Sequence, residues 1–488
     1  MDLRELKFLV KHTSIYGIGT VVGQAVSFFL LPVYTRYLTP NDYGIMALVN
    51  ATMGIIGMVV GLGINNAMSR FYFDFDTEEE KKKVISTVYI IGVLIGIVFF
   101  PVFYFCAGII SKFVLGSDQF TTLFLIAFAA LLFGILVNIC FDYMRIVAAS
   151  TKYVTISLIR MFVIISLNIY FIAVVKTGVI GIFYSSLIGA SMFSIPLSVD
   201  LLRKVGLGFS FTVAKEMIKY SFPLIFSNVF RVIVNESDKY FINYFFSPFE
   251  TGIFSLAQKV GSSIHVLITS PFLQTYLPRR FELMKRDNAK SIYADISLSY
   301  LLIISTVGLA LSIFSPEIIH IMTTSQYFEA SKYIPFIVLS LIIFGMKYHF
   351  QIGIMIEKRT KFIAYINGVS CIVNVALNWI LIRTYGIWGA IIAINISYAV
   401  ITILDYFISQ RMYPIRYEFC KMAKIIALIS LSYYVSTVAT SESILISFTI
   451  KAAIFASYIV LLFLADVIKL QNFLPILTST IKRANPRM

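Results

Sequence analysis

Charged residues are scarce in this chain of 488 residues: only 13% are Asp, Glu, Lys or Arg, whereas soluble domains carry about a quarter. Hydrophobic residues make up 59% of the chain and are concentrated in long runs. A water-soluble protein is therefore excluded.

Cysteine and histidine are also rare, with four of each. The cysteines form no CxxC pair and no histidine stands at metal-ligand spacing, so neither a disulfide framework nor a metal site is expected. The chain has no Walker loop, no nucleophile elbow and no His–acid pair in a loop between apolar runs. We expect a protein that is not an enzyme and holds no cofactor.

The formal net charge of +15 raises the question of nucleic acid. The Lys and Arg residues, however, fall in short clusters between apolar runs rather than along one helical face or tail. That distribution is typical of membrane topology signals. Nucleic acid is therefore not an expected partner, and membrane lipid is.

Fourteen stretches reach the roughly 20 apolar residues that a membrane-spanning helix needs. They are 12–36, 43–66, 84–108, 119–141, 153–175, 179–202, 216–246, 252–276, 293–314, 332–356, 361–384, 387–410, 421–440 and 444–466. The first run lacks a small-residue cleavage site, so we expect a retained span. Most Lys and Arg fall on the N-terminal side, which predicts cytoplasmic termini and a location in the cell inner membrane.

An internal repeat relates the two halves of the chain at an offset of about 208 residues. Residues 38–45, LTPNDYGI, match 246–253, FSPFETGI. Shorter matches join TKY at 151–153 to TKF at 360–362, and GVIG at 178–181 to GIWG at 386–389.

Because the offset covers six spans, both copies enter the membrane from the same side, which predicts a parallel repeat about an axis along the membrane normal. The expected fold is an all-α polytopic membrane protein, with two six-helix lobes around a central cavity and two further C-terminal helices. The expected domains are 1–210, 211–415 and 416–488.

The richest set of polar residues inside a predicted span lies at 216–246, where Asn228, Arg231, Asn235 and Asp238 share one helical face. Glu236 and Lys239 lie beside this stripe. Ionisable groups within a membrane cost several kcal/mol unless they have a partner or line a cavity. The stripe therefore lines water or, alternatively, pairs within the bundle and only holds helices together.

Cations outnumber acids in the spans, because Arg160, Lys259 and Lys347 are further isolated cations. The expected ligand is therefore anionic, and phosphate on a carrier lipid fits this charge. Arg160, Lys259 and Lys347 join Arg231, Lys239, Asn228 and Asn235 as the predicted substrate-binding residues.

Three other polar features have more ordinary interpretations. Asn367, Asn374 and Asn378 form a stripe that either meets sugar hydroxyls or joins neighbouring helices, and the sequence favours neither. Asp405 is interpreted as an interfacial acid near the cytoplasmic end of its span. Lys451 is close enough to the end of its helix to snorkel.

Short motifs connect the chain to a known family. Residues 31–38, LPVYTRYL, with DYG at 42–44, and residues 238–242, DKYFI, with ETGIF at 250–254, resemble the polysaccharide-biosynthesis flippases. YGIWGA at 385–390 is similar to another segment of this family, which belongs to the multidrug/oligosaccharidyl-lipid/polysaccharide exporter superfamily. The resemblance covers about residues 8 to 466.

The resemblance implies a flippase that moves an undecaprenyl-diphosphate-linked repeat unit of O-antigen, the glycan of lipopolysaccharide, or of capsule to the periplasmic face by alternating access. A polysaccharide polymerase and a chain-length regulator are implied partners. The matched motif points to Asp238 and Lys239, to which the charge pattern adds Arg231. Coupling to H⁺ or Na⁺ through Asp238 or Glu236 is a hypothesis motivated by acids beside cations.

Alternative functions remain at this stage. A multidrug or cation antiporter of the same superfamily would need acids to dominate its cavity, and the cationic surplus argues against it. A membrane-embedded polysaccharide polymerase would need catalytic residues in a periplasmic loop, and the longest such loop offers only Glu317, His320 and Glu329. A flippase for teichoic acid, for a sporulation-related glycan or for the peptidoglycan precursor shares the logic of the cavity.

Overall fold

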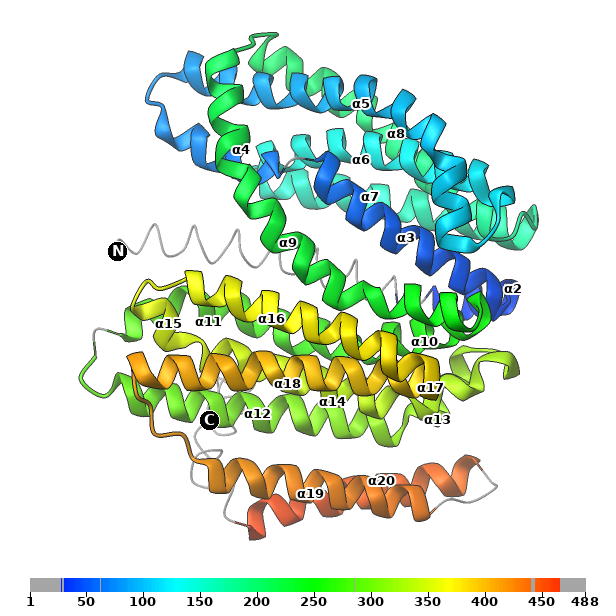
Figure 1. Ribbon diagram of the computed structural model, residues 1–488, viewed down its shortest axis with the longest axis vertical. Coiled ribbons are helices and arrows are strands. Elements are labelled where there is room, and N and C mark those ends of the chain that lie inside the picture. The colour runs from blue at the N-terminus through cyan, green and yellow to red at the C-terminus, as the bar shows by residue number, and fades with distance from the viewer. Residues whose placement is uncertain (1–27, 29, 62, 285, 440–443, 466–488) are drawn as a thin grey trace, which may run out of the picture. The chain divides into compact units, whose positions relative to one another are not determined.

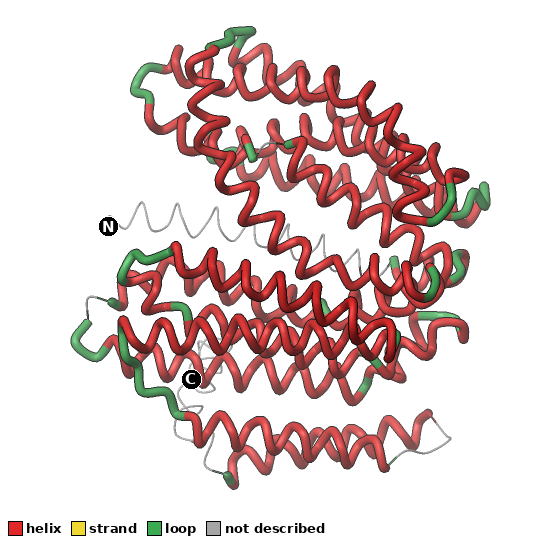
Figure 2. Tube along the Cα trace, in the orientation of Figure 1, coloured by secondary structure: helices red, strands yellow, loops and turns green. Residues whose placement is uncertain are grey.

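The computed structural model describes residue 28 and residues 30–61, 63–284, 286–439 and 444–465. This part of the chain consists of helices joined by loops, and it contains no strand (Figures 1 and 2). The predicted all-α class is confirmed. Among the described residues, 11 helices are long and apolar enough to cross a membrane.

These helices cover the predicted spans apart from the first, seventh and eighth. The first, at 12–36, lies mostly outside the described residues. The seventh forms a continuous helix, α9 (Phe211–Phe245), and the eighth is built from α10 (Pro248–Gly261), the π-helix η3 (His265–Thr269) and α11 (Ser270–Leu283). Both segments are helical. The seventh carries several charged residues, among them Glu236, Asp238 and Lys239, whereas the eighth is divided among three shorter helical elements.

The chain forms two compact units. Unit 1 contains the described residues up to Leu256 together with Met322–Tyr327 and Asn367–Ser397. Unit 2 contains Ala257–Ile321, Phe328–Ile366 and the described residues from Tyr398 onward. The sequence-based boundaries at 1–210, 211–415 and 416–488 stay a prediction.

Unit 1 is a bundle in which α6 packs against α5 and α8, and α9 packs against α3 and α4. Its N-terminal elements before α9 are α2 (Leu31–Tyr37), α3 (Pro40–Val60), α4 (Ile64–Asp74), α5 (Glu78–Leu115), η1 (Asp118–Phe120), α6 (Thr121–Ile146), α7 (Ser150–Ile169), the π-helix η2 (Tyr170–Val174) and α8 (Val179–Val205). The later segment of unit 1 holds most of α16 (Lys361–Leu377), the π-helix η5 (Asn378–Ile382), α17 (Arg383–Tyr385) and the start of α18 (Ile387–Met412).

Unit 2 is built around α12, which contacts α14, α19 and α20. Its elements include α12 (Ala289–Ile313), α14 (Ile334–Phe350), α15 (Ile352–Ile356), α19 (Phe419–Val438) and α20 (Ile444–Leu464). It also holds α13 (Ser315–Met322) up to Ile321 and the 3₁₀ segment η4 (Ser325–Lys332) from Phe328 onward. The C-terminal helices α19 and α20 pack side by side.

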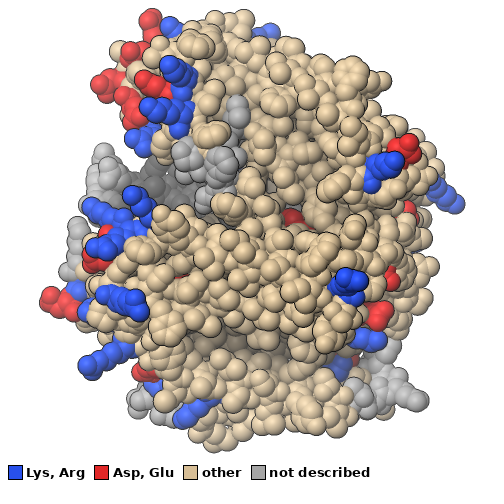
Figure 3. Space-filling view, in the orientation of Figure 1, with Lys and Arg blue, Asp and Glu red and all other residues tan. Residues whose placement is uncertain are grey.

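The uncharged surface of the helices suits a hydrocarbon environment. In Figure 3 the charged side chains gather over the ends of the helices and leave a broad uncharged zone between them. On α5, Phe105 and Phe113 are 77% and 87% exposed. Such side chains are stable outside the bundle when the surrounding solvent is lipid.

The repeat found in the sequence has a structural counterpart at the start of α3 and of α10. Thr39 and Asp42 form a capping box, in which the amide of Asp42 donates to Thr39 Oγ1 and the amide of Thr39 donates to Asp42 Oδ2. In the second copy, the Ser247 hydroxyl donates to the carboxylate of Glu250. Both acids lie at a helix N-terminus, where the helix dipole favours negative charge.

Two π-helices recur at the same offset of about 208 residues, η2 beginning at Tyr170 and η5 beginning at Asn378. Each is followed by a glycine with positive φ, Gly178 at 67° and Gly386 at 56°. Matching π-helical turns at matching positions add structural support for the repeat.

Candidate functional site

The best-defined polar site in unit 1 surrounds Asp238 on α9. This side chain is 0% exposed, although it carries an ionisable group in a predicted span. Buried carboxylates require hydrogen-bond donors, a proton or a cation. The groups around Asp238 therefore decide what the site can do.

The donor that reaches Asp238 comes from the segment α16–η5. Asn378 Nδ2 donates to Asp238 Oδ1 at 2.6 Å and also lies 3.1 Å from Ser237 Oγ. Ser237 Oγ in turn donates to Asn374 Oδ1 at 2.9 Å. Four side chains from two helices thus form one buried network, which we call the Asp238 network.

Local backbone geometry explains why both asparagines face α9. Asn374 and Asn378 are four residues apart, so they lie on one face of the helix. Asn378 is also the first residue of η5, and π-helical turns inserted into helices are frequent at functional sites. Trp379 then packs against Tyr244 and Phe245 of α9, which holds the two helices together on the next turn.

The Asp238 network has spare hydrogen-bonding capacity. Within the described part of the chain, Asp238 Oδ2 and Asn378 Oδ1 have no donor, and Asn374 Nδ2 has no acceptor. Two oxygens without donors, one of them from a carboxylate, form an arrangement that can accept a proton or coordinate a small cation through oxygen.

Glu236 and Lys239, beside this network on α9, pair with one another. Lys239 Nζ lies 2.5 Å from Glu236 Oε2, three residues earlier on the same helix. The side chain of Lys239 is 12% exposed and that of Glu236 is 29% exposed, so the pair is partly accessible. The pair balances the charge of Lys239 within α9 itself.

A further contact ties α9 to α3. The hydroxyls of Tyr240 and Thr52 lie 2.9 Å apart, and α3 belongs to the same unit.

A separate contact in unit 1 involves Tyr327, whose hydroxyl donates to the carbonyl of Leu38 at 2.9 Å. Burial, followed by nearby Tyr43 and Asp42, raises the pKa of the Tyr327 hydroxyl, so it remains a donor.

The other predicted substrate-binding residues in unit 1 are less well defined. Asn228 and Arg231 belong to the helical backbone of α9, but their side chains lie outside the described residues. Asn235 is half-buried on the same helix. Arg160, on α7, is half-buried, and its Nε has no hydrogen-bond partner among the described side chains.

The two remaining predicted cations belong to unit 2. Lys259 on α10 is exposed, whereas Lys347 on α14 is buried with Nζ 5.4 Å from the centroid of the Phe344 ring. Because they belong to the other unit, the predicted central cavity that would unite them with Arg160 and Arg231 stays a prediction.

Two interpretations from the sequence were wrong. Asp405 is not an exposed interfacial acid, because it is fully buried and neither carboxylate oxygen has a hydrogen-bond partner in the described part of the chain. Lys451 does not snorkel to a surface. It is buried and forms an ion pair with Glu317, because α13 places a carboxylate against the middle of α20.

The polar side chains of the longest predicted periplasmic loop, which a polymerase would need for catalysis, have other partners. Glu317 is paired with Lys451, His320 stacks on Phe328 at 4.4 Å, and Glu329 lies 3.6 Å from Lys332. Glu317, His320 and Glu329 therefore do not assemble into a common catalytic centre.

The sequence does not predict the partners of Asp238. It places Asn374 and Asn378 on one helical stripe that fits two interpretations equally, and it gives no sign of a role for Ser237. Both asparagines are 0% exposed and contact α9. This arrangement fits the interpretation that they join neighbouring helices. The only available signal was the helical spacing of the asparagines, which says nothing of the helix they meet.

Solved structures of a membrane flippase and of multidrug transporters share this fold. The lipid II flippase MurJ, in an inward closed conformation, matches with a TM-score of 0.74 and 17% identity over 94% of this chain and 100% of its own. An inward-facing multidrug resistance MATE transporter of the MOP superfamily matches with a TM-score of 0.64 and 14% identity over 83% of this chain and 96% of its own. The predicted two-lobe architecture is confirmed.

The chain belongs to the polysaccharide biosynthesis protein family, whose model matches residues 33–332. It is 23% identical over 222 residues to a probable low-salt glycan biosynthesis flippase, Agl15, of Haloferax volcanii, a match that spans 44% of this chain and 46% of that protein. It is also 21% identical over 374 residues to an uncharacterized membrane protein of Haemophilus influenzae, spanning 75% of this chain and 88% of that one.

Proposed function

We propose that this protein is a flippase that carries a lipid-linked oligosaccharide from the cytoplasmic to the periplasmic face of the cell inner membrane, with cytoplasmic termini. The polysaccharide biosynthesis family and the two-lobe fold support transport of a lipid-linked glycan. The observation that carries the mechanism is the Asp238 network, which places a buried acid with one unsatisfied oxygen between two helices.

The network provides a physical basis for ion coupling. When Asp238 is charged and has no bound cation, its Oδ2 lies unsatisfied in a buried site, which is costly. A proton on Asp238, or Na⁺ held by Asp238 and Asn378 oxygens, removes that cost and changes the stability of the contact between α9 and η5. A gradient of either ion then biases the conformation of unit 1, since an ion shifts an equilibrium only as far as it binds one state better. Glu236 contributes to coupling only if its pair with Lys239 opens.

The substrate we propose is an undecaprenyl-diphosphate-linked repeat unit of O-antigen or capsule. Diphosphate is best recognised by guanidinium and ammonium groups. Arg231, Arg160, Lys259 and Lys347 are the proposed contacts, and Lys239 joins them when its pair with Glu236 separates. Asn228 and Asn235 are proposed to meet the glycan. A polymerase and a chain-length regulator would act next on the flipped units.

The test compares cells with and without the protein. Periplasmic exposure of lipid-linked repeat units is measured in cells lacking the protein, after complementation with wild type, Arg231→Ala or Asp238→Asn at matched expression. Units should accumulate on the cytoplasmic face, and both variants should fail to restore exposure. Glu329→Gln, at an exposed acid in a loop, is the matched control and should restore it fully.

Normal exposure without the protein would overturn the flippase function. The antiporter alternative would then be tested by measuring drug accumulation, because it predicts that cells lacking the protein retain cationic drugs. Failure of Arg231→Ala together with success of Asp238→Asn would keep the flippase and reject the coupling site.

A further inference from the structure

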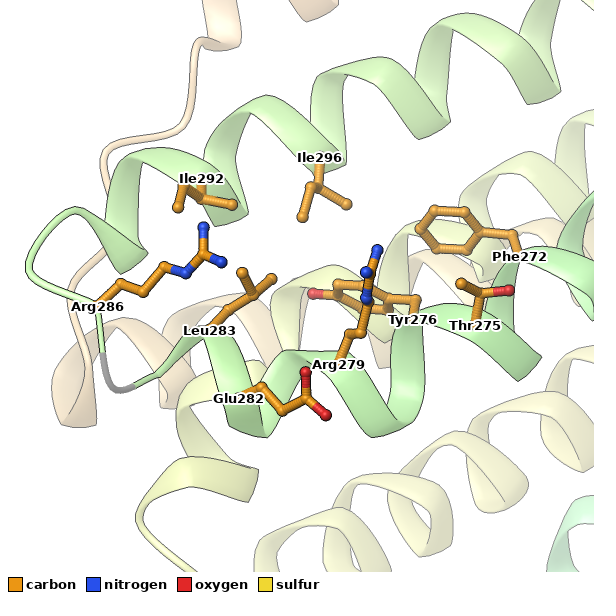
Figure 4. A pocket seen from close by; sticks show the side chains of 9 residues that line it. All are labelled: Phe272, Thr275, Tyr276, Arg279, Glu282, Leu283, Arg286, Ile292 and Ile296. Carbon is orange, nitrogen blue, oxygen red and sulfur yellow. The ribbon is translucent and has the colours of Figure 1, made fainter. Parts of the chain in front are cut away.

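Unit 2 contains a cavity of about 400 Å³ where α11 meets α12 (Figure 4). Its walls combine aromatic, aliphatic and charged side chains. They are Phe272, Thr275, Tyr276, Arg279, Glu282, Leu283, Arg286, Ile292 and Ile296. Pockets that hold small ligands measure about 300 to 1,000 Å³, so the cavity has the size of a binding site.

The floor of this cavity is part of the hydrophobic core of unit 2. Tyr276 is buried and stacks on Phe272 at 5.1 Å, and Leu283 and Ile296 pack against the same cluster. The turn between the two helices is held by Tyr293, whose hydroxyl donates to the carbonyl of Arg280 at 2.5 Å. The apolar walls are therefore already formed before any ligand binds.

Two guanidinium groups reach over this floor. In Figure 4, Arg279 and Arg286 both extend toward the side occupied by Ile292 and Ile296, whereas the carboxylate of Glu282 is directed away from these isoleucines. Neither arginine has an ion pair with any residue that the structure describes, and both are exposed. With Glu282 counted, the pocket carries one net positive charge.

The position of the pocket along the chain indicates that it lies next to the membrane surface. The loop between the predicted spans 252–276 and 293–314 is basic and expected on the cytoplasmic side, next to the membrane surface. Cytoplasmic leaflets carry anionic lipids, and basic pockets at this level bind their headgroups. Arginine is suited to phosphate because its planar fork donates two parallel hydrogen bonds.

We propose that this pocket binds an anionic glycerophospholipid, with Arg279 and Arg286 holding the headgroup phosphate and with Phe272, Ile292 and Ile296 covering the upper part of an acyl chain. The apolar walls distinguish this occupant from free phosphate, which gains nothing from isoleucine and phenylalanine. The volume suits a small headgroup. The lipid then braces the junction of α11 and α12 in the folded protein.

The proposal is tested by native mass spectrometry of the full-length protein in detergent, titrated with phosphatidylglycerol and, separately, with phosphatidylcholine. Wild type should retain phosphatidylglycerol preferentially, and Arg279→Ala/Arg286→Ala should weaken its retention by about tenfold or more, because two charge-assisted hydrogen-bonding groups are lost. Ile292→Trp fills the pocket without changing charge and should weaken retention as well. Arg359→Ala, at an exposed cation on the same predicted side, is the matched control.

Several results would overturn the proposal. Undiminished phosphatidylglycerol binding in both variants would place the lipid elsewhere. Equal retention of phosphatidylcholine would remove the role of the anionic headgroup. Competition by inorganic phosphate would identify a free-anion site, and preferential displacement by a polyprenyl phosphate would assign the pocket to a different lipid. These outcomes do not depend on whether the protein flips glycans.

Discussion

Lys451 Nζ lies 2.7 Å from one carboxylate oxygen of Glu317 and 3.0 Å from the other, and both side chains are at least nine-tenths buried. Ser447, one turn earlier on α20, donates to the same carboxylate at 3.0 Å. This ion pair joins the C-terminal helices α19 and α20 to the rest of unit 2 through α13.

Removing one member of this pair should destabilise unit 2. Lys451→Met leaves Glu317 buried without its counter-ion, and loss of one partner of a buried pair costs about 3 to 5 kcal/mol. Thermal unfolding in detergent should show a clear decrease in the melting temperature. The double variant Lys451→Met/Glu317→Leu should recover most of that loss, since no charge is then buried. A double variant as unstable as the single one would show that packing, rather than charge, holds α20.

Gly44 and Gly252 allow two helices to approach closely, because neither position has room for a Cβ atom. A Cβ atom on Gly44 would lie 1.8 Å from the carbonyl oxygen of Pro248, and one on Gly252 would lie 1.9 Å from that of Pro40. Backbone atoms cannot move aside as side chains do, so we expect Gly44→Ala and Gly252→Ala each to destabilise unit 1 by about 3 kcal/mol or more. The yield of monodisperse protein after purification measures this effect.

Gly54→Ala is the control in the same helix, because a Cβ there meets no atom within 4 Å. It should be neutral or slightly stabilising, by up to about 1 kcal/mol, since alanine is the better helix former. Equal yields for Gly44→Ala and Gly54→Ala would contradict the close crossing of α3 and α10.

Exchanging the groups at Asp238 and Asn378 tests the coupling site directly. Asp238→Asn alone should reduce transport by at least about tenfold, as expected when a charge-assisted hydrogen bond is lost. Asp238→Asn/Asn378→Asp exchanges the carboxylate and the amide that lie 2.6 Å apart in the native protein, and it should restore part of the activity. Transport is followed in proteoliposomes with imposed H⁺ or Na⁺ gradients. No recovery in the exchanged variant would mean that the carboxylate must remain on α9.

Cysteine labelling tests the predicted orientation. Cys420, at the start of α19, is exposed and is expected on the cytoplasmic side, whereas Cys140 and Cys371 are buried. A variant that retains only Cys420 should react with a membrane-impermeant maleimide in inverted vesicles and not in intact cells lacking an outer membrane. Variants that retain only Cys140 or only Cys371 should react in neither. Labelling of Cys420 from outside would reverse the proposed topology.

The sequence predicts the fold well, because each membrane-spanning helix needs a long apolar run that is visible in the sequence. The membrane span at α9 is harder to predict. The charged residues that form its polar site, such as Asp238 and Lys239, also make the helix less apolar. The repeat was visible from helix N-terminal residues such as Asp42 and Glu250, since helix caps have local sequence rules.

The partners of buried polar groups were much harder to predict. Periodicity shows that Asn374 and Asn378 share a face, but the helix opposite them is set by tertiary packing. Lys451 shows the same difficulty, because its distance from the end of its helix allows snorkelling and only the position of Glu317 decides against it. The site could thus be predicted as a set of residues on α9, and its chemistry required the structure.

The duplicated halves are unequal in one respect. At the offset of about 208 residues that relates the caps and the π-helices, Asp238 corresponds to Leu30 and Asn378 corresponds to Tyr170. The scaffold is therefore symmetric while the ionisable chemistry is present in a single copy. A lone carboxylate of this kind sets the stoichiometry at this position: one proton or one monovalent cation is the most it can exchange in each turnover, whatever the size of the glycan that is carried.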